Sequence, residues 1–149
     1  MEYKSIVYVE SPFQLLSASN YLSQNRKSLL LYRSSQPQLE ELIQMSNFVS
    51  RSIRVASIAS IALIFVSILR RNVEQLGVGD IRSTISLLLY SVFRKADILM
   101  FDDGAYTVSV DEDGDPVFNA GYVKIKSQLI RRCFLKHNLY RYTILDHEI

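Results

Sequence analysis

The stretch that decides the fold is Ile6-Val7-Tyr8-Val9, which is followed at once by Glu10-Ser11-Pro12. The first four residues are apolar and mostly β-branched, without polar alternation, which is typical of a strand buried on both faces of a parallel sheet. Ser11 suits a helix N-cap and Pro12 suits the first helical position. The sequence therefore predicts a central strand that runs directly into a helix ending at about Gln24.

Strand-like and helix-like segments alternate along the rest of the chain. The predicted strands are 29–32, 52–57, 97–101 and 140–145, the predicted helices are 38–48, 58–71, 81–95 and 121–137, and 77–79 is a predicted loop. Two short strands around an acidic turn predict a β-hairpin over 106–118. The pattern indicates an α/β fold, with a Rossmann-like, mostly parallel, doubly wound sheet in a single domain over 1–149.

The amino-acid composition argues against several classes of protein function. The chain has 149 residues, about one domain, and is 48% hydrophobic and 21% charged, as globular proteins are. Its net charge of +2 is too small for the basic surface expected of a nucleic-acid-binding protein, so no nucleic-acid partner is predicted. The single cysteine and two histidines argue against a disulfide framework and a metal cluster, so no metal site is predicted.

The N-terminal residues lack the charged and apolar regions of a signal peptide, which predicts a cytoplasmic location. One apolar run, from Val55 to Leu69, carries no charge and lies between Arg54 and Arg70-Arg71. It is shorter than the roughly 20 apolar residues that a membrane-spanning helix needs. A buried strand leading into a buried helix explains it. A helix in peripheral contact with an anionic surface such as the inner membrane is the alternative.

Asp102-Asp103-Gly104 follows the predicted strand 97–101. In open α/β sheets, ligands bind beyond the carboxyl ends of the strands. Successive side chains of a strand point to opposite faces, so one of the two carboxylates is expected to enter a cleft. A carboxylate placed there can act as a general base, and Gly104 permits a sharp turn. An ordinary Asp-Gly turn that leads into a hairpin explains the same residues equally well.

The stretch Val9-Glu10-Ser11-Pro12-Phe13-Gln14-Leu15-Leu16-Ser17-Ala18 resembles the opening of a group of bacterial glycosyltransferases. These are the lipooligosaccharide sialyltransferases and the capsular polysialyltransferases. Phe101-Asp102-Asp103-Gly104-Ala105-Tyr106 resembles their second motif, two acidic residues and a glycine followed by a hairpin. The two motifs stand in the family order, and the pair is more specific than either motif alone.

The resemblance implies a GT-B architecture, in which two Rossmann-like domains face each other. This chain would be the N-terminal domain, which holds the acceptor oligosaccharide of a surface polysaccharide or lipooligosaccharide. Asp102 matches the family's general base, and Asp103 would be a supporting carboxylate beside Gly104. Ser11 and Gln14 would line the acceptor cleft, although helix capping and packing explain them too. No cofactor is expected in this domain, because the donor, CMP-sialic acid, binds the C-terminal one.

The sequence departs from the family in one respect. The family carries a His-Pro motif in its C-terminal domain, whereas Asn138 and Glu148 follow the two histidines of this chain. The resemblance therefore implies that the nucleotide-sugar domain is absent or is a separate partner, and that this chain alone is inactive. An uncovered interdomain face would also favour self-association.

Two other interpretations fit the same residues. The chain could be a non-catalytic interaction module, or a degenerate fragment of such an enzyme. It could also be an unrelated small α/β binding protein in which Asp102-Asp103-Gly104 is only a turn.

Overall fold

The computed structural model describes residues 3–33, 36–57, 59–62, 64, 72–80, 83–101 and 139–142. The strands are β1 (Ser5–Val9), β2 (Ser28–Tyr32), β3 (Ser52–Arg54), β4 (Gln75–Val78), β5 (Asp97–Phe101) and β6 (Leu139–Tyr142). The helices are α1 (Pro12–Gln24), α2 (Pro37–Met45) and α4 (Thr84–Val92), and residues 59–62 and 64 are helical as well.

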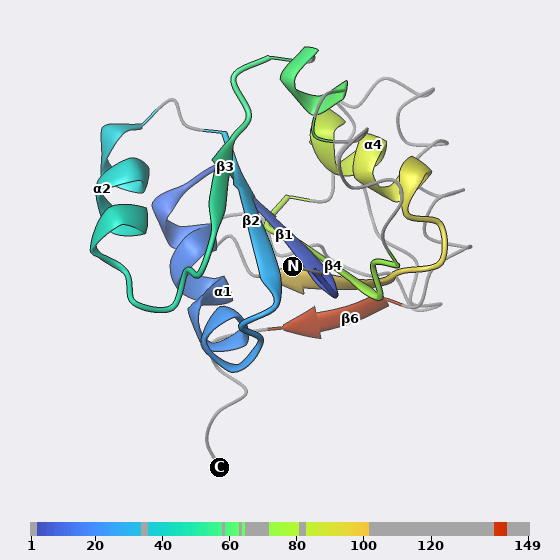
Figure 1. Ribbon diagram of the computed structural model, residues 1–149, viewed down its shortest axis with the longest axis horizontal. Coiled ribbons are helices and arrows are strands. Elements are labelled where there is room, and N and C mark those ends of the chain that lie inside the picture. The colour runs from blue at the N-terminus through green and yellow to red at the C-terminus, as the bar shows by residue number, and fades with distance from the viewer. Residues whose placement is uncertain are drawn as a thin grey trace, which may run out of the picture.

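The six strands form one sheet in the order β3-β2-β1-β4-β5-β6, and all five neighbouring pairs are parallel. Helices α1 and α2 cover one face of this sheet, and α4 covers the other (Figure 1). This order is that of the doubly wound Rossmann fold, in which the direction of winding reverses between the two central strands. The predicted α/β class and the parallel, Rossmann-like sheet are confirmed.

Strand β1 lies at the centre of the sheet and all five of its residues are buried. Ile6 and Tyr8 pack into the core on the α4 face, whereas Val7 and Val9 pack into the core under α1 and α2. Successive side chains alternate between the faces of a strand. An apolar run without polar alternation is therefore what this position requires, and the prediction from Ile6-Val7-Tyr8-Val9 is confirmed.

The predicted loop at 77–79 is wrong in part, because Gly77 and Val78 belong to strand β4. Residues Gln75–Val78 contain a glycine and a glutamine and have weak strand propensity of their own. They form a strand because β1 and β5 supply parallel hydrogen-bonding partners on both sides. A Cβ at Gly77 would lie 2.5 Å from Cε2 of Phe101 and 3.2 Å from Cγ2 of Val7. The missing side chain thus makes room for the Phe101 ring over β4.

The ends of the other elements differ modestly from the predictions. Helix α4 begins at Thr84 because Ser83 caps it, its side chain accepting a hydrogen bond from the Ser86 N–H. The helix ends at Val92, so both ends lie inside the predicted 81–95. Strand β6 is Leu139–Tyr142, so it begins one residue before the predicted 140–145. The predicted hairpin over 106–118 and the predicted helix over 121–137 lie outside the described residues.

Three described residues of the uncharged run are buried, whereas Ala56, Ser57, Ala59 and Ala62 are exposed. Val55, Ile61 and Ile64 belong to the apolar cluster on the α4 face, which supports the buried interpretation for these residues. Within the part of the chain that the structure describes, no helix is long and apolar enough to cross a membrane. Peripheral contact with a membrane surface stays a prediction.

Replacing Gly77 by alanine should destabilise the fold, because the new methyl group would push the Phe101 ring out of its position over β4. Overpacking of this kind costs about 1–3 kcal/mol in the free energy of unfolding. Urea unfolding followed by circular dichroism measures it. The double variant Gly77→Ala/Phe101→Leu should lose less than the sum of the two single variants. Strictly additive losses would contradict the contact.

Candidate functional site

The candidate site lies where the winding of the sheet reverses, at the carboxyl ends of β1 and β4. Strand β1 leads through Glu10 and Ser11 into α1, and β4 leads through Gly79 and Asp80 towards α4. In doubly wound sheets the loops after two such strands separate to opposite faces and leave a crevice, where ligands bind. The residues that form this edge are therefore the first candidates for ligand binding or catalysis.

Ser11 and Gln14 close the turn between β1 and α1. The Ser11 Oγ accepts a hydrogen bond of 3.2 Å from the Gln14 N–H, which makes Ser11 the N-cap of α1. The Gln14 side chain turns back, and its Oε1 accepts a hydrogen bond of 2.7 Å from the Glu10 N–H. Gln14 is buried. These bonds hold the turn rigid, and the predicted contact of Ser11 and Gln14 with an acceptor sugar stays a prediction.

Gly79 lets the turn after β4 approach the start of α1. The Gly79 N–H donates a hydrogen bond of 3.1 Å to the Tyr8 carbonyl, so the chain still follows β1 at this point. A Cβ at Gly79 would overlap the end of the Gln14 side chain. Gly79 is therefore required by the position of Gln14, in the way that glycine commonly allows close approach of backbone to another group.

A hydrogen-bonded cluster joins the end of β1 to the start of α4. The Tyr8 hydroxyl donates to Oε1 of Glu10, and the Ser83 hydroxyl donates to the same oxygen at 3.2 Å. Ser83 Oγ in turn accepts from the Ser86 N–H at 3.4 Å, and Ser86 Oγ donates to the Asp80 carbonyl at 2.6 Å. The half-buried Glu10 carboxylate is thus held by two hydroxyl groups, while its second oxygen accepts no hydrogen bond from the described residues.

The environment of Tyr8 raises the pKa of its hydroxyl well above the ordinary value. Burial is the largest cause, because it disfavours the phenolate, and the hydrogen bond to Glu10 and the charge of Glu10 act in the same direction. The hydrogen bond with Ser83 and the charge of Arg33 oppose the effect. Tyr8 therefore keeps its proton throughout the physiological range and acts as a hydrogen-bond donor to Glu10.

The second sequence motif begins at this edge of the sheet. Phe101 is the last residue of β5, which pairs with β4, and its ring packs against Tyr21 with 5.8 Å between centroids. The residues that follow, Asp102, Asp103 and Gly104, lie outside the described residues. Their predicted roles as base, supporting carboxylate and turn residue stay predictions.

Sequence reasoning did not single out Tyr8, Glu10 or Ser83. One signal was present, since Tyr8 and Glu10 are two residues apart around a strand end and so share a face. Their contact with Ser83 joins segments far apart in the sequence, which no local pattern reveals. Among the residues that the structure describes, no three His, Cys, Asp or Glu side chains lie close enough to hold a metal ion.

Comparisons with models of known protein families, with curated proteins and with solved structures find no match to this chain.

Gly79→Ala should displace the Gln14 side chain and break its bond with the Glu10 N–H. We expect a loss of about 1–3 kcal/mol in the free energy of unfolding, as for other overpacked sites. Gln14→Ala alone should lose about 1 kcal/mol with its hydrogen bond. In the double variant the new methyl group meets no side chain, so the losses should not add. Chemical denaturation of all four proteins tests this, and additivity would exclude the contact.

The raised pKa of Tyr8 predicts how stability changes with pH. The folded chain holds the Tyr8 proton more tightly than the unfolded chain, whose tyrosines titrate near pH 10. The stabilisation from this proton is complete below that pH and is lost as the pH rises above it. Tyr8→Phe should be less stable at pH 8, because it lacks the bond to Glu10, but should lose less stability than the wild type between pH 9 and pH 11. Parallel stability curves from urea unfolding would contradict the assignment.

Proposed function

We propose that this chain is the acceptor-binding, base-bearing domain of an inverting glycosyltransferase similar to the bacterial lipooligosaccharide sialyltransferases and capsular polysialyltransferases. The proposal includes a GT-B arrangement with a nucleotide-sugar domain, the donor CMP-sialic acid and a cytoplasmic location. It rests on the two sequence motifs and on the part of the fold that they share.

The observation that carries the proposal is the position of both motifs against strand β4. Gln14, from the first motif, lies over Gly79, and Phe101, the first residue of the second motif, lies over Gly77. Residues two apart on a strand share a face and are separated by roughly 6.5 Å. One residue from each of two motifs far apart in the sequence thus lies over β4 or the residue after it, at the edge where α/β proteins bind ligands.

The reaction would need one base and accurate positioning from this domain. The acceptor hydroxyl gives its proton to the Asp102 carboxylate while its oxygen forms a bond to the anomeric carbon of the donor sugar. The bond from that carbon to the CMP phosphate oxygen breaks, and its electron pair leaves with the phosphate. Holding the hydroxyl against the donor accounts for much of the rate. Asp103 supports the base, and the second oxygen of Glu10, which accepts no hydrogen bond from the described residues, can accept one from the sugar.

A non-catalytic interaction module is the second candidate. Phe13 and Leu16 are three residues apart on α1, so they share a face of the helix, and they are 45% and 48% exposed. Two large apolar side chains exposed together favour contact with a partner or a second copy of the chain.

Titration of the isotope-labelled chain with galactose-terminated and sialylated oligosaccharides tests the proposal. We expect the amide signals of Glu10, Gln14 and Gly79 to shift in heteronuclear NMR spectra, because these residues form the edge next to both motifs. Asp102→Asn should keep the shape of the site but weaken binding by a few-fold. In any preparation that transfers sugar, it should lower turnover by about 10²-fold or more.

CMP alone and a mannose oligosaccharide are the controls, and neither should shift these signals. If no oligosaccharide shifts them at millimolar concentration, acceptor binding is wrong and the interaction module becomes the better explanation.

A further inference from the structure

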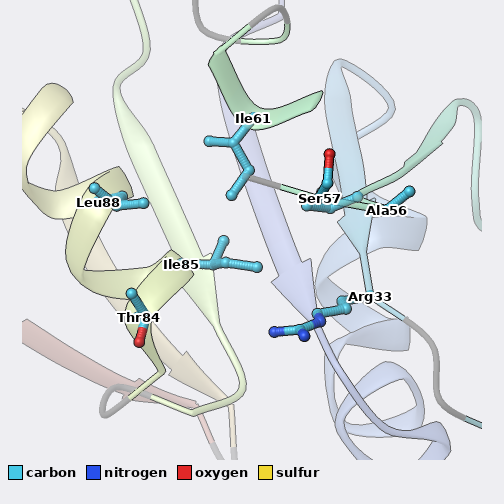
Figure 2. Close-up of a pocket in the computed structure, with 8 residues that line it drawn as sticks. Arg33, Ala56, Ser57, Ile61, Thr84, Ile85 and Leu88 are labelled. Atoms are coloured by element: carbon cyan, nitrogen blue, oxygen red, sulfur yellow. The ribbon is translucent and has the colours of Figure 1, made fainter. Parts of the chain in front are cut away.

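A cavity of about 200 Å³ lies beside the candidate site, on the α4 face of the sheet. Its lining comes from the chain after β2, from the chain after β3 with the helical segment that follows, and from the first turns of α4 (Figure 2). Ile61 and Ile85 point into the space between these elements (Figure 2). Together with Val55 and Leu88 they give the cavity aliphatic walls.

The cavity also has a positive charge at one side. The Arg33 N–H donates a hydrogen bond of 3.1 Å to the Val9 carbonyl, which fixes the backbone beyond the end of β2. The exposed Arg33 side chain extends towards α4 (Figure 2), and it forms no ion pair with the described residues. A guanidinium group that no described carboxylate pairs with, next to an apolar cavity, is suited to bind an anionic group of a ligand.

Two residues that carry hydroxyl groups, Ser57 and Thr84, also line the cavity. Ser57 and Thr84 are both exposed and contribute to the cavity from opposite sides, one after β3 and the other at the first residue of α4. A few polar groups on mostly apolar walls are the usual composition of a small-molecule site. The volume is below the roughly 300–1,000 Å³ that is typical for drug-sized ligands, so the ligand should be small.

The surroundings argue against nucleotides and sugars in this cavity. In Rossmann domains the region after the second strand holds part of a dinucleotide, whose pyrophosphate lies on a glycine-rich turn after the first strand. Here that turn is Glu10-Ser11-Pro12-Phe13, which has no glycine and carries the negative charge of Glu10, a charge that disfavours a phosphate nearby. Aliphatic walls also leave most hydroxyl groups of a sugar without partners, which is costly.

We propose that this cavity binds a small carboxylate with a compact branched aliphatic body, the body lying among Ile61, Ile85 and Leu88 and the carboxylate pairing with Arg33. The site would be separate from any acceptor site at the Gln14 turn and does not depend on glycosyl transfer. Its ligand would contact the segments that follow β2 and β3 together with α4, and would therefore stabilise the α4 face of the fold.

The test is a titration of the labelled chain with isocaproate, followed by heteronuclear NMR. We expect the amides of Ser57, Thr84 and Ile85 to shift, with a dissociation constant in the millimolar range. The neutral isocaproamide, which keeps the body without the charge, should bind at least about tenfold more weakly. Acetate, which keeps the charge without the body, should also bind at least about tenfold more weakly.

Arg33→Gln should weaken isocaproate binding about tenfold and leave the weak binding of isocaproamide unchanged. Arg33 is exposed, so this variant should fold normally. Arg94→Gln, which removes another exposed arginine just beyond the far end of α4, is the matched control and should bind isocaproate as the wild type does. The proposal is overturned if the three amides do not shift, if isocaproamide or acetate binds as well as isocaproate, or if the two arginine variants behave alike.

Discussion

The hydroxyl group of Tyr8 is buried at the centre of the sheet and must have an acceptor, because an unpaired buried hydroxyl is costly. Glu10, two residues further along the same face, supplies it, and Ser83 adds a second hydrogen bond to the same oxygen. This cluster fixes the end of β1 against the start of α4. The turn at Gln14 lies next to this cluster on the α1 face of the sheet. The cavity beside Arg33 lies next to it on the α4 face.

Strand β4 and the residue after it matter mainly because two glycines leave room there for neighbouring side chains. Gly77 of β4 and the adjoining Gly79 lie under Phe101 and Gln14, which come from β5 and α1. Larger residues at these two positions would displace the Phe101 ring and the Gln14 side chain. The short β4 and Gly79 therefore bring together Gln14 and Phe101, which belong to two motifs far apart in the sequence.

The sequence pattern was sufficient where one strand or one helix determines its own structure. The apolar run Ile6-Val7-Tyr8-Val9, the cap at Ser11 and the strand 97–101 were predicted from local residues alone. Gln75–Val78 was missed because its neighbours, not its own propensity, make it a strand. The link between Glu10 and Ser83 was missed for a related reason, since it depends on the end of β1 lying next to the start of α4. The roles predicted for Asp102, Asp103 and Gly104 are still predictions.

The strand order has a consequence for how the chain is made. Strand β1 can pair with β2 soon after both have left the ribosome, but its other edge pairs with β4, beginning at Ser5 and Gln75. Until β4 is synthesised, this largely apolar strand has one open edge, which is a template for wrong pairing. Non-local parallel pairing is also slow to form. The central position that makes β1 the most buried strand of the finished protein thus makes it the most exposed to misfolding during synthesis.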